Sequence, residues 1–176
     1  GIFITMAEDY YMLQEPEVSI RLSKKALRLD PDNLDARYIL ALSYEATKQY
    51  DQALSIYQQI VKMRPHDIES LYYLTSLQVI AGKPKDAMKN YKKMLRSGFD
   101  DPQYLLQVGN LFLEHRAVPQ AQKIYLDLLK EHPEIEAIYL ALAATDKARQ
   151  DTTGAIRWYE QAVMRNPQFE DAKAEL

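Results

Sequence analysis

Cysteine is absent from the sequence, histidine occurs three times and glycine five times in 176 residues. Without cysteine the chain can form neither disulfide bonds nor a zinc site with thiolate ligands. The histidines, His66, His115 and His132, have no second ligand at the i, i+4 spacing of a helical metal site. Gly82 and Gly109 are isolated, so no glycine-rich loop is available to bind phosphate. No catalytic residue, metal or cofactor is predicted, and we expect that the protein is not an enzyme.

The sequence also has no large excess of positive or negative charge and no long apolar run. The formal net charge is −3, which gives no general attraction to nucleic acid or to an anionic membrane. No apolar run approaches the roughly 20 residues that cross a bilayer, so direct membrane insertion is not expected. The apolar residues 1–5 are too short for a signal peptide, and a chain that begins with Gly1 is expected to be a trimmed part of a longer protein. The cellular compartment stays undetermined, because a cysteine-free chain is compatible with both the cytoplasm and an oxidising compartment. Of the two, the cytoplasm is the simpler expectation.

A strict repeat of 34 residues runs through the chain. Residues of four kinds recur at this period without insertion or deletion. The four columns are Leu40, Leu74, Val108 and Leu142; Ala53, Ala87, Ala121 and Ala155; Tyr57, Tyr91, Tyr125 and Tyr159; and Pro31, Pro65, Pro133 and Pro167, with Phe99 in the remaining proline position. Self-similarity at a fixed period of this length predicts stacked structural repeats.

Each period carries the pattern of two amphipathic helices. In the second repeat, Ala53 and Tyr57 follow the i, i+4 spacing of one helix face. Asp51 precedes this face and is predicted to be the helix N-cap. Proline ends the repeat because it cannot continue a helix. Where Phe99 replaces proline, Gly98 is expected to end the helix in the left-handed conformation.

This pattern resembles the tetratricopeptide repeat. The pieces that carry the resemblance in the second repeat are Leu40-Ala41, Tyr44, Ala53, Tyr57, Ile60 and Pro65, and the next three repeats keep the same register. The resemblance implies an all-α fold, an α-solenoid in which about five helix–turn–helix repeats wind into a right-handed superhelix. It also implies that the alanine and tyrosine columns are buried where helices cross.

The resemblance covers residues 1–176 as a single array. The repeats are expected near residues 1–33, 34–67, 68–101, 102–135 and 136–169, and residues 170–176 are expected to start a capping helix or a further repeat. The first repeat is degenerate, because Ser19 and Ser23 occupy its alanine and tyrosine positions. Gln78 and Asp146 stand where an aromatic residue is usual, so looser packing is expected in those two repeats.

The resemblance further implies that the first helix of each repeat lines a concave groove that binds a partner. Nine residues are expected to form the ligand site: Tyr38, Leu42, Glu45, Glu69, Tyr72, Val79, Leu106, Asn110 and Leu113. Their spacings of three and four residues place them on one helix face. An apolar and partly acidic groove suits a peptide or an amphipathic helical segment that offers apolar anchors and some Lys or Arg. The family's clamp for chaperone carboxylates requires basic and amide residues where Tyr38, Leu42 and Tyr73 stand, so that mode is not expected.

Three alternatives remain beside this interpretation. Tyrosine and leucine at helical spacing also occur in ordinary cores, where they pack against the next repeat. A homo-oligomer is a second possibility, with the groove filled by the chain itself or by a sister chain. RNA recognition by helical repeats requires basic groove residues, which this sequence lacks. The third repeat carries a group of basic residues, Lys89, Lys92, Lys93 and Arg96. The simpler interpretation is a solvated convex surface, and the alternative is a docking site for an anionic partner.

Overall fold

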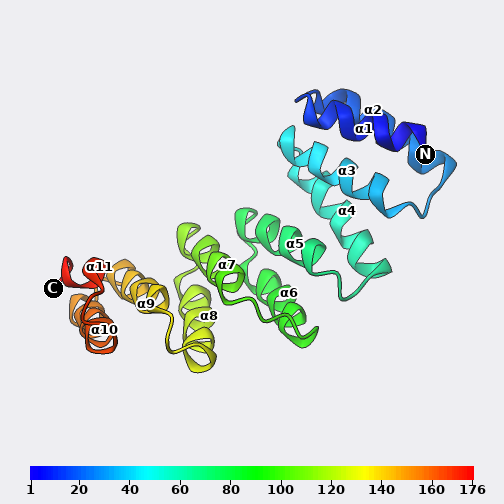
Figure 1. Cartoon of the computed structure of the whole chain (residues 1–176). Coiled ribbons are helices and arrows are strands. Elements are labelled where there is room, and N and C mark those ends of the chain that lie inside the picture. The colour runs from blue at the N-terminus through cyan, green and yellow to red at the C-terminus, as the bar shows by residue number, and fades with distance from the viewer. The chain divides into compact units, whose positions relative to one another are not determined.

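The computed structural model describes all 176 residues and contains eleven helices and no strand (Figure 1). The helices are α1 (Ile2–Met12), α2 (Pro16–Leu29), α3 (Leu34–Ala46), α4 (Tyr50–Met63), α5 (Ile68–Ile80), α6 (Pro84–Arg96), α7 (Pro102–Glu114), α8 (Val118–Glu131), α9 (Glu136–Ala148), α10 (Thr152–Arg165) and α11 (Glu170–Lys173). Each predicted repeat contains two helices, and α11 is a short additional helix. The all-helical fold predicted from the period is therefore confirmed.

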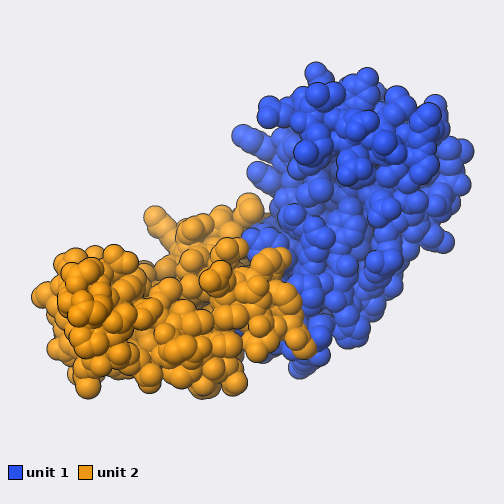
Figure 2. All heavy atoms as spheres, in the orientation of Figure 1, with its two compact units in different colours: residues 1–78, 89–97 blue, residues 79–88, 98–176 orange.

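The chain divides into two compact units, which Figure 2 shows in different colours. Unit 1 comprises residues 1–78 and 89–97, and unit 2 comprises residues 79–88 and 98–176. In unit 1, α1 packs against both α2 and α3, and α3 packs against α4. In unit 2, α8 packs against both α7 and α9, and α10 packs against α9 and α11. The single continuous array expected from the sequence stays a prediction.

The alanine and tyrosine columns form the core of the helix pairs. Every member of the two columns is buried, as the repeat predicts. Alanine allows the two helices of a repeat to approach closely, and tyrosine fills the space one turn further on. In the first repeat, where both residues are replaced, Ser19 and Ser23 are also fully buried. The hydroxyl of Ser19 donates a hydrogen bond to the carbonyl oxygen of Ala7, 2.7 Å away, which replaces part of the lost packing.

The turn inside every repeat contains one residue in the left-handed conformation. These residues are Gln14, Lys48, Gly82, Arg116 and Gln150, with φ angles of 61°, 58°, 69°, 60° and 63°. They follow the 34-residue period, although their side chains share no chemical property that would reveal it. Gly98 has a φ angle of 78°, so the left-handed helix end predicted there is confirmed.

The prediction of Asp51 as an N-cap is wrong. Helix α4 begins at Tyr50, and its N-cap residue is Gln49, whose side chain makes no capping hydrogen bond. The left-handed residue Lys48 turns the chain so sharply that the helix starts before Asp51. The carboxylate lies in the first helical turn, where it still interacts favourably with the helix dipole.

Hydrogen bonds replace the missing aromatic residues in the third and fifth repeats. The Asn90 side chain donates to Oε1 of Gln78 at 2.8 Å, and the indole N–H of Trp158 donates to Oδ2 of Asp146 at 2.9 Å. Gln78 and Asp146 are both buried. The looser packing expected in these repeats is therefore not observed, because each polar side chain has a partner on the second helix of its own repeat.

Candidate functional site

The nine predicted ligand residues fall into two groups, one in each unit. Unit 1 contains Tyr38, Leu42 and Glu45 on α3 and Glu69 and Tyr72 on α5. Unit 2 contains Val79 at the end of α5 and Leu106, Asn110 and Leu113 on α7. Glu69 and Asn110 are exposed, and all the others except Val79 are half-buried.

Val79 does not present a surface to a ligand. Its side chain is 2% exposed, so it belongs to the core. Burial of a branched apolar side chain stabilises the fold. Helical spacing alone does not distinguish a residue inside the core from one at the edge of the core. The placement of Val79 on the ligand surface is therefore corrected.

Tyr38 ties α3 to the start of α5. Its hydroxyl donates to the carboxylate of Asp67 and also contacts the hydroxyl of Ser70. Asp67 in turn accepts a hydrogen bond from the backbone N–H of Ser70 at 2.9 Å, and so satisfies an orphan donor at the helix N-terminus. Burial and the hydrogen bond to Asp67 raise the pKa of Tyr38 above its usual range. Tyr38 therefore has a structural role whether or not it contacts a partner.

Glu45 connects the surface of α3 to the core. Tyr57 is fully buried, and its hydroxyl donates to Oε1 of Glu45 at 2.7 Å. Burial raises the pKa of the Glu45 carboxyl, although the hydrogen bond from Tyr57 acts in the opposite direction. Burial and the nearby Glu45 carboxylate also raise the pKa of Tyr57. The hydrogen bond to the buried Tyr57 thus holds the Glu45 carboxylate partly out of water.

Four tyrosines from three helices form an aromatic group that we call the tyrosine cluster: Tyr38, Tyr57, Tyr72 and Tyr73. The rings of Tyr57 and Tyr73 are stacked, with centroids 5.1 Å apart and planes 11° apart. Tyr38 meets Tyr57 edge to face at 6.3 Å, and Tyr72 meets Tyr73 edge to face at 5.7 Å. Offset stacked and edge-to-face arrangements are the favourable geometries for aromatic pairs.

Tyr73 stands at one of the clamp positions of the groove but is not among the nine residues predicted to form the ligand site. Burial raises its pKa, and so do the neighbouring carboxylates of Glu69 and Glu45. Its side chain is half-buried and adjoins both predicted acids of unit 1. The signal that could have found it is the Tyr72-Tyr73 pair, since two successive aromatic residues on a helix cannot both face the core. We call the surface formed by Tyr38, Leu42, Glu45, Glu69, Tyr72 and Tyr73 the unit-1 face.

Unit 2 repeats the link between a core tyrosine and a surface side chain. The hydroxyl of Tyr125 donates to Oδ1 of Asn110 at 2.6 Å. The Tyr125 ring lies against Gly109, where a Cβ atom would be 2.9 Å from Cδ1 of the ring and closer still to Cε1. Glycine is required at this helix position because any side chain would displace the tyrosine.

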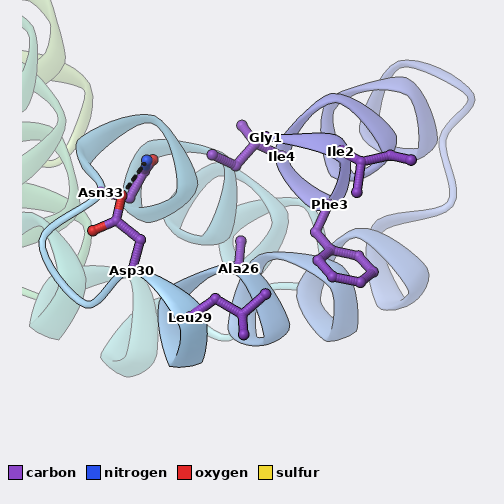
Figure 3. Close-up of a pocket in the computed structure, with 8 residues that line it drawn as sticks. All are labelled: Gly1, Ile2, Phe3, Ile4, Ala26, Leu29, Asp30 and Asn33. Carbon is purple, nitrogen blue, oxygen red and sulfur yellow. Dashed lines mark hydrogen bonds between the residues drawn. The ribbon is translucent and has the colours of Figure 1, made fainter.

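Two cavities lie in unit 1. The first, of about 210 Å³, is lined mainly by apolar residues of α1 and α2, with Asp30 and Asn33 at its edge (Figure 3). Asn33 donates to Oδ2 of Asp30 at 3.0 Å and caps α3 by accepting from the N–H of Ala36, so this polar pair is engaged in structure. The second, of about 470 Å³, is lined by Tyr11, Met12, Gln14, Pro16 and Ala46.

The unit-1 face offers hydrogen-bonding, aromatic and apolar groups. No group of three or more His, Asp or Glu side chains is placed to hold a metal ion. None of the helices combines the length and apolar character needed to cross a bilayer. The unit-1 face therefore presents aromatic rings, hydrogen-bonding groups and negative charge.

Comparisons with known proteins agree with the repeat. Residues 13–78 and 46–111 match the family model described as Tetratricopeptide repeat, which together is more than half of the chain. Tetratricopeptide repeat protein 8 of Caenorhabditis elegans is 23% identical over 107 residues, which cover 61% of this chain and 21% of that protein. The chain spans less than half the length of the curated relatives it matches.

Solved structures confirm the α-solenoid fold. The crystal structure of MamA protein matches with a TM-score of 0.75 and 16% identity over 99% of this chain and 94% of that one. YrrB, described as a TPR protein with an unusual peptide-binding site, matches with a TM-score of 0.69 and 17% identity over 98% of this chain and 89% of that one. At these identities the likeness concerns the fold alone.

Proposed function

The chain belongs to the tetratricopeptide-repeat family, and on that premise we propose that its unit-1 face binds a peptide or helical segment of another protein. The fold is that of a protein-interaction scaffold. The partner segment supplies apolar anchors and some Lys or Arg. The peptide-binding site named for YrrB supports this mode of recognition in a protein of similar fold.

The tyrosine cluster is the observation that carries the proposal. Tyr72 and Tyr73 are half-buried, so part of each side chain remains accessible, and Tyr73 lies near the carboxylates of Glu45 and Glu69. Aromatic side chains that are held in place by their neighbours lose little entropy on binding and dominate many interfaces. A binding role accounts for aromatic surface that the core does not fully bury.

Selection of peptides from a displayed library against the whole chain tests this function. We expect amphipathic peptides with Leu or Phe anchors and basic residues to be enriched. Tyr72→Ala should lose these peptides, whereas Lys92→Glu, an exposed change on α6, should retain them. Peptides that bind the Tyr72→Ala variant as well as they bind the wild type would contradict the proposal.

Self-association is the second candidate. The first repeat exposes several large apolar side chains, including Met12 at 74% and Leu29 at 72%. Exposed apolar surface of this kind favours association with another protein or a second copy. Light scattering across a range of protein concentrations separates the two functions, because self-association predicts a mass that rises with concentration.

A further inference from the structure

One oxygen of the Glu45 carboxylate has a partner and the other has none in the chain. Oε1 accepts the hydrogen bond from the Tyr57 hydroxyl at 2.7 Å. No Lys or Arg forms an ion pair with Glu45, although the side chain is half-buried. The second oxygen still reaches water, but half-burial without a counter-charge disfavours the charged form of the carboxylate.

The hydrogen bond to Tyr57 does not explain why a charge is present at this position. A neutral amide would accept the same hydrogen bond without the cost of burying a charge. In unit 2 a neutral amide accepts from the equivalent tyrosine, although from another position of the repeat: Oδ1 of the exposed Asn110 accepts from Tyr125 at 2.6 Å. The hydrogen bond to Tyr57 requires an acceptor at this position, but it does not require a negative charge.

The surroundings of Glu45 are aromatic and acidic. Tyr57 from α4 and Tyr73 from α5 stack beside it, and Tyr11 from α1 interacts electrostatically with both of their hydroxyls. Glu69, on α5, adds a second negative charge near Tyr73. None of the titratable groups identified around Glu45 is a cation, so the site attracts positive charge.

We propose that Glu45 and Tyr73 form a subsite for an arginine side chain of the partner, with the guanidinium hydrogen-bonded to the carboxylate and stacked on the exposed part of the tyrosine ring. This subsite rests on the function proposed for the unit-1 face and names the chemistry of its ligand. Guanidinium is planar, is weakly hydrated and stacks on aromatic rings, whereas the lysine ammonium is a strongly hydrated point charge. Arginine therefore fits a half-buried carboxylate beside a stacked ring better than lysine does.

The test uses acetyl-arginine methylamide as the probe and acetyl-citrulline methylamide as its neutral counterpart of the same shape. Each is titrated into the whole chain, and amide chemical shifts are followed by NMR. The arginine probe should shift Glu45 and Tyr73 at a concentration roughly tenfold lower than the citrulline probe, the difference expected from one charge-assisted hydrogen bond. The lysine analogue should fall between them.

Glu45→Gln is the decisive variant, because glutamine keeps an acceptor for Tyr57 while removing the charge. The preference for arginine over citrulline should disappear in Glu45→Gln and persist in Glu160→Gln, a change of an exposed acid on α10. Equal response to the two probes in the wild type overturns the proposal, as does a preference that survives in Glu45→Gln. The wild-type comparison stands even if the variant folds poorly. If selected peptides bind through Tyr72 but the arginine probe does not bind, the subsite is contradicted and the proposed function stands. If neither the peptides nor the arginine probe binds, the proposed function is contradicted as well.

Discussion

The hydroxyl of Tyr57, a fully buried residue, lies 2.7 Å from Oε1 of Glu45, a half-buried residue of the helix before it. The same side chain therefore fills the core of the second repeat and fixes a carboxylate at its surface. Core packing and the position of a surface carboxylate are coupled at this point of the fold, so a variant must be designed to change one without the other.

Tyr57→Phe separates the hydrogen bond from the packing. We expect the free energy of unfolding to fall by about 0.5–1.5 kcal/mol, the usual net value of one hydrogen bond. Tyr57→Ala should cost about 3–5 kcal/mol because it also leaves a cavity. Urea unfolding of both variants measures the difference. The pKa of Glu45 should rise further in Tyr57→Phe, because burial remains and the opposing hydrogen bond is lost. An unchanged pKa, followed by NMR, would show that the hydrogen bond is not formed in solution.

Gly109→Ala is expected to destabilise the protein, although alanine in a helix is ordinarily favoured over glycine by about 1 kcal/mol. The added Cβ atom would overlap the Tyr125 ring. Thermal unfolding of the single variant gives the sign of the effect. Tyr125→Leu removes the ring, so adding Gly109→Ala to that variant should cost less or become favourable. An equal effect in both backgrounds would rule out the ring as the cause.

Stability near pH 4 should depend on Asp67. Burial alone would raise the pKa of this carboxyl, but the hydrogen bonds from Ser70 and Tyr38 outweigh it and lower the pKa below its usual value. A lowered pKa contributes stability at pH values above the pKa of the unfolded chain, and the contribution is lost as the pH falls through the folded value. Asp67→Asn keeps a capping acceptor and removes the charge, so its melting temperature should fall less than that of the wild type between pH 7 and pH 3. Parallel pH curves would contradict this role.

The last repeat should exchange its amide hydrogens faster than the repeat before it. Its cluster of Tyr139, Ala143, Ala155, Tyr159 and Ala162 is covered at the end of the chain by α11, which contains four residues and contributes one buried side chain, Ala172. In repeat proteins, stability is nearly a sum of neighbour interactions, so a weakly covered end opens first. Hydrogen exchange should show lower protection in residues 155–162 than in residues 121–128. Equal protection would mean that α11 and the Lys147–Glu175 ion pair suffice as a cap.

The sequence predicts the repeat architecture well because its period has chemical signatures. Alanine is required where two helices approach closely, and tyrosine is required beside it, so both columns are legible in the residue types. The left-handed turn residues follow the same period but escape notice, because Lys48, Arg116 and Gly82 share no side-chain property. Backbone conformation at these positions is imposed by the packing of the flanking helices.

The surface is less predictable than the core. Spacing places Val79 and Glu45 in the same column, yet one is buried and the other half-buried. Partners supplied by another helix are also invisible in the spacing of a single helix. Tyr38 is an example, because its hydrogen bonds to Asp67 and Ser70 give it a structural role that the pattern does not indicate.

This role makes Tyr72 a better test of partner binding than Tyr38, because Tyr38→Ala would also remove the link between α3 and α5. Tyr91, which is 1% exposed, serves as the core control, and Lys92 serves as the exposed control on α6. We expect Tyr72→Ala to lower the melting temperature less than Tyr91→Ala, since its ring is only half-buried.

Binding of a selected peptide to Tyr72→Ala, Tyr91→Ala and Lys92→Glu, with the melting temperature of each variant, tests the central claim most directly. Tyr72→Ala should weaken binding by about 1–3 kcal/mol, as the loss of an aromatic anchor usually does. Lys92→Glu should leave binding unchanged, and Tyr91→Ala should act mainly on the melting temperature. If Lys92→Glu abolishes binding while Tyr72→Ala binds normally, the partner does not bind at the unit-1 face.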